Sequence, residues 1–150
     1  MDYKDIILEA SDGKKHSLKD FKNKKIVLYF YPKDNTPGCS MQAQEYTTYH
    51  EDFEENNTIV IGVSRDSITS HHKFIKNKEL NLLLLSDIDS KLSNEFQVIK
   101  EKTMFGKSAL GVERSSFILD ENANVVEEYR KVKAAGNAKA MLERIIELNK

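Results

Sequence analysis

Short apolar runs alternate with amphipathic segments along the chain. Three runs consist almost entirely of β-branched, aromatic or leucine residues, as in strands buried on both faces of a sheet. These runs span residues 26–31, 59–63 and 82–85. Apolar residues spaced three or four apart follow each run and indicate helices. The alternation predicts an α/β domain with a central sheet.

The segments before and after these runs are less regular. Residues 6–10 predict a first strand, and Ser17 with Asp20 three residues later has the spacing of a capping box at a short helical turn. Residues 100–113 contain two glycines and show no clear period, so we expect them to form a loop.

The C-terminal part predicts a hairpin and a helix. Two strand-like runs, 115–119 and 125–129, flank a polar segment. Asn137 is expected to cap a last helix whose apolar residues face the core. We see no linker or repeat, so residues 1–150 are expected to form a single domain.

Composition and charge narrow the possible functions. The 150 residues are 39% hydrophobic and 31% charged, with a formal net charge of −1. Such a balance gives no strong field for nucleic acid or for a membrane surface, and no apolar run approaches the length that crosses a bilayer. The acidic N-terminus lacks a signal-peptide pattern. The four histidines show no spacing with cysteine or acidic residues that indicates a metal, so no metal or cofactor is expected.

Cys39 is the residue with the clearest candidate chemistry. It is the only cysteine, so the chain has no internal disulfide and suits a reducing compartment, which we expect to be the cytoplasm. It follows a strand-like run and precedes a helix-like stretch. Unpaired backbone N–H groups and the positive end of the helix dipole favour a thiolate there. The alternative is a small buried hydrophobe, but the polar flanks of Cys39 favour a reactive thiol.

The residues around Cys39 resemble a known motif. Residues 30–43, Phe-Tyr-Pro-Lys-Asp-Asn-Thr-Pro-Gly-Cys-Ser-Met-Gln-Ala, closely resemble the active-site motif of peroxiredoxins. The nearest match is the bacterioferritin comigratory protein, or Q-type, subfamily. Weaker matches follow in family order and cover most of the chain: Gly62–Ser64 with Asp66, Leu84–Asp87, Met104–Lys107 and Arg114–Asp120.

This resemblance implies a thioredoxin-like fold, with a central mixed β-sheet flanked by helices and an N-terminal β extension. It also implies a thiol-dependent peroxidase that reduces hydrogen peroxide and organic hydroperoxides through a sulfenic acid on Cys39. Arg114 matches an arginine that would stabilise the thiolate and hold the peroxide oxygens. Thr36 matches a threonine whose hydroxyl would contact thiolate and peroxide. Pro32 matches a proline that shields the site, although it fits a simple strand terminator equally well.

The chain departs from the subfamily because it has no resolving cysteine. Many members carry one five residues after the peroxidatic cysteine, where this chain has Gln44, and others carry one on a later helix, near Ser93. The sulfenic acid would therefore meet an external thiol: a small thiol, a thioredoxin-like or glutaredoxin-like protein, or Cys39 of another copy. The sequence leaves open whether the chain is a natural one-cysteine enzyme or carries a replaced cysteine at position 44 or 93.

Two further expectations follow from the resemblance. The subfamily implies a monomer or a small homo-oligomer. A redox sensor or thiol-regulated binding protein that uses the same cysteine is the alternative function, because a sulfenic acid lasts longer without a resolving cysteine. Gln42 falls one helical turn after Cys39, where it could face the site, but it is expected to be solvated. Asp34 is expected to shape the loop, and His71 to lie at the surface or the edge of the core.

Overall fold

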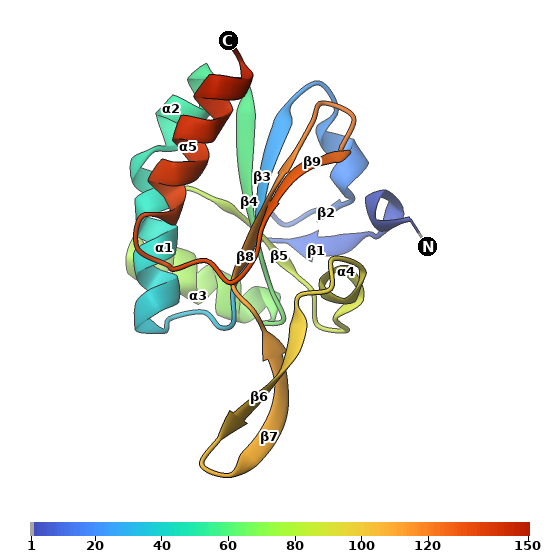
Figure 1. Ribbon diagram of the computed structural model, residues 1–150, viewed down its shortest axis with the longest axis vertical. Helices are drawn as coiled ribbons and strands as arrows, with labels where there is room; N and C mark the ends of the chain where they lie inside the picture. Colours follow the sequence, from blue (N-terminus) through green and yellow to red (C-terminus); the bar gives the residue numbers. More distant parts are fainter. Residues whose placement is uncertain (1) are drawn as a thin grey trace.

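The computed structural model describes residues 2–150, and for Met104 it describes the backbone only. A seven-stranded sheet crosses the molecule in the order β2-β1-β5-β4-β3-β8-β9 (Figure 1). The strands of this sheet are β1 (Leu8–Ala10), β2 (Lys15–His16), β3 (Lys25–Phe30), β4 (Thr58–Ser64), β5 (Leu83–Ser86), β8 (Ser115–Leu119) and β9 (Val125–Tyr129).

The sheet combines parallel and antiparallel pairs. β3 pairs in parallel with β4, and β4 with β5, because a helical segment lies in each crossover. β8 and β9 add antiparallel beside β3, and the short β1–β2 hairpin adds antiparallel to β5. The expected mixed sheet with an N-terminal β extension is confirmed.

Helices cover both faces of the sheet. Alternation along β3 separates two cores, because Val27 and Tyr29 pack on one side while Ile26 and Leu28 pack on the other. The first side is covered by α1 (Pro37–Thr48), α2 (His50–Glu55), α3 (Ile68–Lys78) and α5 (Asn137–Leu148). The second is covered by α4 (Lys91–Glu95) and the 3₁₀ turns η1 (Tyr3–Asp5) and η2 (Leu18–Phe21). No helix within residues 2–150 is both long and apolar enough to span a bilayer.

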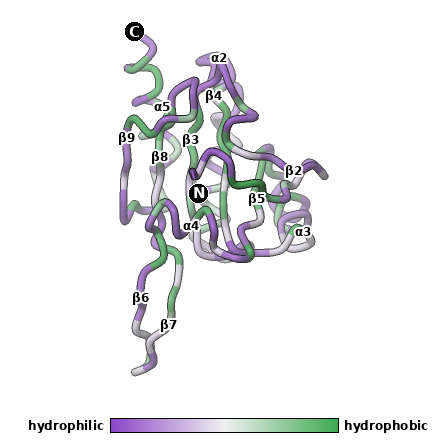
Figure 2. The backbone as a smooth tube through the Cα atoms, turned by 90° about the vertical axis from the view of Figure 1, so that its right-hand side faces the viewer, coloured by the Kyte–Doolittle hydropathy of each residue, from purple (hydrophilic) through white to green (hydrophobic). Residues whose placement is uncertain are grey.

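The prediction of a loop at residues 100–113 was wrong. β6 (Ile99–Met104) and β7 (Lys107–Val112) form a separate two-stranded hairpin that projects from the rest of the chain (Figures 1 and 2). Phe105 and Gly106, with φ of 53° and 76°, make its two-residue turn. The described side chains at its tip are exposed, so no buried face imposes the alternating pattern that reveals a strand.

The start of the last helix also differs from expectation. Gly136, with φ of 83°, is the N-cap of α5, and Asn137 is its first helical residue. Asn137 is buried, and its side chain turns inward rather than capping the helix. The cap role assigned to Asn137 was therefore wrong, and its amide serves another contact, described below.

Candidate active site

Cys39 lies in the first turn of α1, directly after the loop that leaves β3. Thr36 is the N-cap and Pro37 the first helical residue, so Cys39 is the third. The first helical hydrogen bond runs from Ser40 N to Thr36 O at 2.8 Å. The N–H groups of Gly38 and Cys39 therefore have no acceptor within the helix. The residue is only 2% exposed, so its sulfur lies at the positive end of a helix and almost out of solvent.

Arg114 brings a guanidinium to this sulfur from the residue just before β8. Its Nη2 lies 3.5 Å from Cys39 Sγ, and its Nη1 donates to Gln42 Oε1 at 2.6 Å. The guanidinium thus places a positive charge and an N–H donor against the sulfur. Gly38 leaves room for it, since a Cβ at that position would lie 3.3 Å from Arg114 Nη2. The structure thus brings together two residues that are 75 positions apart.

Gln42 is part of this site, and the expectation that it is solvated was wrong. It is fully buried, one helical turn after Cys39, and its Nε2 donates to Asn137 Oδ1 at 3.0 Å. The spacing of three placed it on the face of α1 that carries Cys39. That spacing was the available signal, but its partner Arg114 comes from the distant β7–β8 connection.

Thr36 and Pro32 flank the sulfur in the chain without bonding to it. Thr36 Oγ1 donates to Lys33 O at 2.8 Å, and no hydrogen bond in the described part of the chain joins it to Cys39. The hydroxyl proton is therefore committed to the loop, and its lone pairs stay available as acceptors. Pro32 is partly exposed, lies two residues after the end of β3, and has no N–H.

A buried ion pair holds the loop between β3 and α1. Asp34 Oδ2 lies 2.7 Å from His71 Nδ1 and accepts from Ser70 Oγ at 2.8 Å, while Oδ1 accepts from Tyr31 OH at 2.6 Å. His71 Nε2 lies 2.9 Å from Leu85 O. Both ring nitrogens of His71 therefore face an oxygen that can accept a hydrogen bond. His71 is fully buried, so the expected surface or core-edge position was wrong.

Asp34 also ties the loop to the segment after β4, through its backbone N–H. Burial raises the pKa of Asp34, but hydrogen bonds from His71 and Tyr31 outweigh burial and hold that pKa below its usual value. The Asp34 N–H also donates to Asp66 Oδ2 at 2.8 Å, and Ser64 Oγ donates to the same oxygen at 2.7 Å. Asp34 therefore shapes the loop as expected, through an anchor that fixes the approach to Cys39.

Two buried hydroxyls beside the site, those of Tyr29 and Ser40, have no hydrogen-bond partner among the residues that the structure describes. The ring of Tyr29 stacks on Tyr46 with centroids 4.6 Å apart. Burial raises the pKa of Tyr29 well above its usual value, and the neighbouring Tyr46 and Cys39 raise it further. Tyr29 is therefore a neutral phenol and brings no charge to the sulfur.

Positions 44 and 93, where other members of the subfamily carry a resolving cysteine, differ in environment. Gln44 is exposed on α1, whereas Ser93 is fully buried in α4. Ser93 Oγ and N both donate to Asp87 Oδ2 at 2.7 Å, and Asp87 is itself fully buried. A hydroxyl is a much better donor than a thiol, so serine suits this position. Within residues 2–150 no group of three His, Cys, Asp or Glu side chains is placed to hold a metal ion.

Comparison with known proteins identifies the class. The model of the AhpC/TSA family matches residues 2–128. The chain therefore belongs to the AhpC/TSA family, and the named relatives within it are peroxiredoxins, enzymes that reduce peroxides with thiols. Peroxidase activity is thus the function of this chain, in preference to a redox sensor.

Relatives and solved structures place the chain in one subfamily. Peroxiredoxin Bcp of Bacillus subtilis is 41% identical over 145 residues, covering 97% of this chain and 92% of that protein. Solved structures of Xanthomonas campestris peroxiredoxin Q and of its bacterioferritin comigratory protein each superpose with a TM-score of 0.94, at 40% and 39% identity, covering 99% of this chain and 94% of theirs. The thioredoxin-like fold and the Q-type resemblance are confirmed.

Proposed function

We propose that Cys39 is the peroxidatic residue. Its thiolate attacks one oxygen of the hydroperoxide, the sulfur supplies two electrons, and the O–O bond breaks. Water or an alcohol leaves after taking up a proton, and a sulfenic acid remains on Cys39. The observation that carries this proposal is the 3.5 Å approach of Arg114 Nη2 to Cys39 Sγ at the start of a helix.

Arg114 and the helix terminus act on the same charge. The guanidinium offers five N–H donors in a fixed plane, of which one faces Gln42 and one the sulfur. The remaining donors are suited to the peroxide oxygens, where negative charge develops as the O–O bond breaks. Arg114 therefore stabilises both the thiolate and the leaving oxygen.

Thr36 and Pro32 complete the proposed site. Because Thr36 Oγ1 donates to Lys33 O, the same oxygen accepts a hydrogen bond from the O–H of the incoming peroxide and orients it. Pro32 keeps water and a competing N–H donor away from the mouth of the site. The catalytic set is therefore Cys39, Thr36, Arg114 and Pro32, with no metal or cofactor.

The substrates are hydrogen peroxide and organic hydroperoxides. Support for the organic substrates comes from the Xanthomonas campestris bacterioferritin comigratory protein, which has alkyl peroxide reduction activity. The enzyme acts in the cytoplasm as a monomer or a small homo-oligomer, without a nucleic-acid or membrane partner.

An external thiol completes the cycle. The chain has one cysteine, and the bond from Ser93 to buried Asp87 supports serine as the functional residue at position 93. The thiol attacks the sulfenic sulfur, water leaves, and a mixed disulfide forms on Cys39. A second thiol then releases the reduced enzyme. A thioredoxin-like protein, a glutaredoxin-like protein or a small thiol fills this role.

Peroxide consumption with dithiothreitol tests the proposal. The wild-type chain should turn over hydrogen peroxide and an alkyl hydroperoxide many times, because its thiolate is regenerated after each turnover. Cys39→Ser should fall to the rate of dithiothreitol alone, since an alcohol is a far weaker nucleophile at neutral pH. Mass spectrometry after stoichiometric peroxide should find one added oxygen on Cys39. Equal, slow consumption by both proteins would contradict the assignment.

A further inference from the structure

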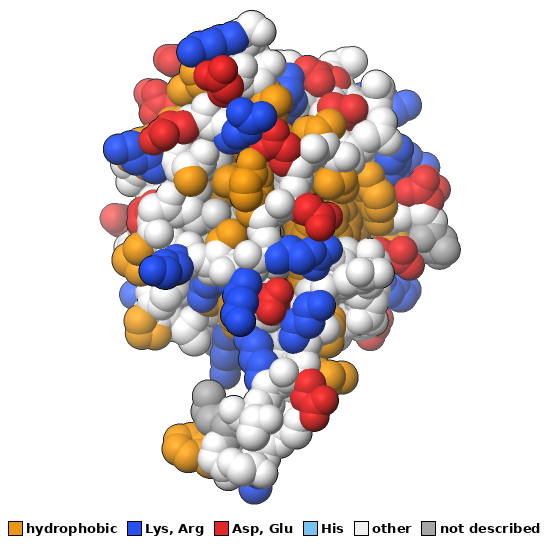
Figure 3. Space-filling view, viewed as in Figure 1, with side chains coloured by type: hydrophobic (Ala, Val, Ile, Leu, Met, Phe, Trp, Pro, Cys, Tyr) orange, Lys and Arg blue, Asp and Glu red, His pale blue; other side chains and the backbone are white. Residues whose placement is uncertain are grey.

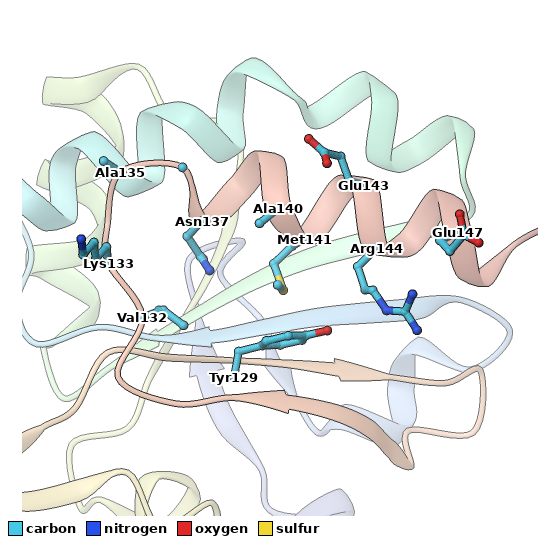
Figure 4. A pocket seen from close by; sticks show the side chains of 11 residues that line it. Tyr129, Val132, Lys133, Ala135, Asn137, Ala140, Met141, Glu143, Arg144 and Glu147 are labelled. Atoms are coloured by element: carbon cyan, nitrogen blue, oxygen red, sulfur yellow. The ribbon is translucent and has the colours of Figure 1, made fainter.

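Asn137 connects the last helix to the active site. Its Oδ1 accepts three hydrogen bonds: from Gln42 Nε2 at 3.0 Å, from Ser116 Oγ at 2.9 Å and from Tyr46 OH at 2.5 Å. Asn137 is 5% exposed, and it lies at the start of α5, beside an open cleft of about 570 Å³ between β9 and α5 (Figure 4). Three elements therefore meet at one amide oxygen.

The chemistry of Arg114 fixes the direction of this hydrogen-bonded chain. A guanidinium has only donors, so Gln42 must present Oε1 to Arg114. The amide of Gln42 then has Nε2 on its other side, and that group needs an acceptor. Asn137 Oδ1 is this acceptor. Each orientation follows from the one before it, starting from Arg114.

The other two donors hold the acceptor in place. Burial raises the pKa of Tyr46, so Tyr46 stays a neutral hydroxyl that can donate. Outside the core, the Gly136 N–H donates to Glu45 Oε1 at 2.8 Å and fastens the start of α5 to α1. Asn137 thus has little freedom to rotate or shift.

We propose that Asn137 is a positioning residue of the peroxidase: it sets the orientation of the Gln42 amide and thereby holds the Arg114 guanidinium against Cys39. This inference rests on the proposed roles of Cys39 and Arg114. Without an acceptor at position 137, Gln42 Nε2 is buried and unpaired, which costs free energy. Turning or moving the Gln42 amide toward another partner lowers that cost. Arg114 then loses the contact that fixes its plane.

The test compares Asn137→Leu, which keeps the volume and removes the acceptor, with the wild-type chain. The second-order rate constant of Cys39 with peroxide should fall about 10- to 100-fold, the range that small misplacements at an active site produce. The pH profile of Cys39 alkylation should shift as well. Asn137→Asp, which keeps an acceptor oxygen, should retain most of the rate.

A double-mutant cycle separates positioning from stability. If Asn137 acts through Gln42, Asn137→Leu should add no further loss of rate in a Gln42→Leu background. Ile145→Ala, a core change on the same helix, controls for destabilisation of α5 and should lower the melting temperature without lowering the rate. If Asn137→Leu does not fold, Asn137→Ser replaces it in the double-mutant cycle, because a serine side chain at position 137 is too short to reach Gln42.

Two results would overturn the inference. One is an unchanged peroxide rate and alkylation profile in a folded acceptor-less variant. The other is full multiplication of the two losses in the double variant, which would mean that Asn137 does not act through Gln42. A wild-type chain whose peroxide consumption does not depend on Cys39 would instead refute the proposed function.

Discussion

At the scale of single residues, the site depends on a side chain that is absent. Gly38 lies in the first turn of α1, where a Cβ would come within 3.3 Å of Arg114 Nη2 and 3.8 Å of Ala134 Cβ. The guanidinium can occupy its place against Cys39 because nothing projects from Gly38. Local stability and reactivity therefore impose opposite requirements at this position.

Gly38→Ala is the corresponding prediction. Alanine favours a helix over glycine by about 0.5–1 kcal/mol, so the melting temperature should stay the same or rise. The added methyl displaces the guanidinium by a few tenths of an ångström, and the peroxide rate constant should fall about three- to tenfold. Thermal unfolding and stopped-flow kinetics measure the two effects.

Ser40→Ala is the matched control for this change. It adds no group near Arg114, and it removes a buried hydroxyl that has no partner, so it should affect neither rate nor stability adversely. A Gly38→Ala enzyme as fast as the wild type would show that the guanidinium tolerates the methyl.

The residues predicted from sequence were those that carry a motif. Cys39 and Arg114 stand in motifs that resemble those of a known family, so the sequence alone predicts that both belong to the site where they are in contact. Gln42 and His71 are polar residues on helices, where solvent is the common environment. Their partners, Arg114 and Asp34, come from other elements, and no local pattern encodes such pairings.

At the scale of elements, the β3–α1 loop depends on the pair between Asp34 and His71. Removing one partner of a buried pair leaves the other uncompensated, so Asp34→Asn should lower the free energy of unfolding at pH 7 by about 3 kcal/mol. The peroxide rate should fall too, because this loop delivers Thr36 and Cys39.

The pH dependence of that loss has a definite sign. Because the folded chain holds the pKa of Asp34 below its usual value, the stabilisation is complete above the unfolded carboxyl pKa of about 3.9 and disappears as the pH falls through the folded value. The unfolding free energies of wild type and Asp34→Asn, measured with denaturant, should therefore converge as the pH falls below about 3.9. Asp89→Asn, at an exposed position, is the control. If the difference in unfolding free energy between wild type and Asp34→Asn stayed constant with pH, the ionised carboxylate of Asp34 would be excluded as the cause of that difference.

Elements were predictable where burial imposes a period. The runs that became β3, β4 and β5 are buried on both faces or nearly so, and the helices between them each bury one face. The β6–β7 hairpin has no such constraint, and its Phe-Gly turn lacks the usual asparagine or aspartate. The cap of α5 was misplaced by one residue, because Gly136 reaches the required backbone without a polar side chain.

At the scale of the whole molecule, the near-neutral net charge conceals an uneven distribution. Lys and Arg side chains gather at the base of the β6–β7 hairpin (Figure 3). A cleft of about 400 Å³ there is lined by four cations and two carboxylates: Lys100, Lys102, Arg114, Lys131, Glu101 and Glu113. No ion pair among residues 2–150 includes one of these four cations. The lining of this cleft, which includes the Arg114 that contacts Cys39, therefore has two more cations than carboxylates.

This distribution predicts a preference for anionic peroxides. A fatty-acid hydroperoxide should react several-fold faster than its methyl ester at low ionic strength, and the advantage should shrink in 0.5 M salt. The ratio of the two rate constants should move toward one in a Lys100→Gln, Lys131→Gln double variant. A Lys73→Gln, Lys76→Gln double variant, with both changes at exposed positions on α3, is the charge-matched control. Equal ratios in all three proteins would show that the cleft does not select for charge.

The single thiol also determines the stoichiometry of each turnover. An enzyme with two cysteines can hold an oxidising equivalent as a disulfide within its own chain. These 150 residues contain no second sulfhydryl with which to form one. Every equivalent must depart with the reductant, so one peroxide consumes two monothiol molecules or a single dithiol. On a non-reducing gel the spent enzyme should migrate like the fresh one, and only a mass spectrum would distinguish them.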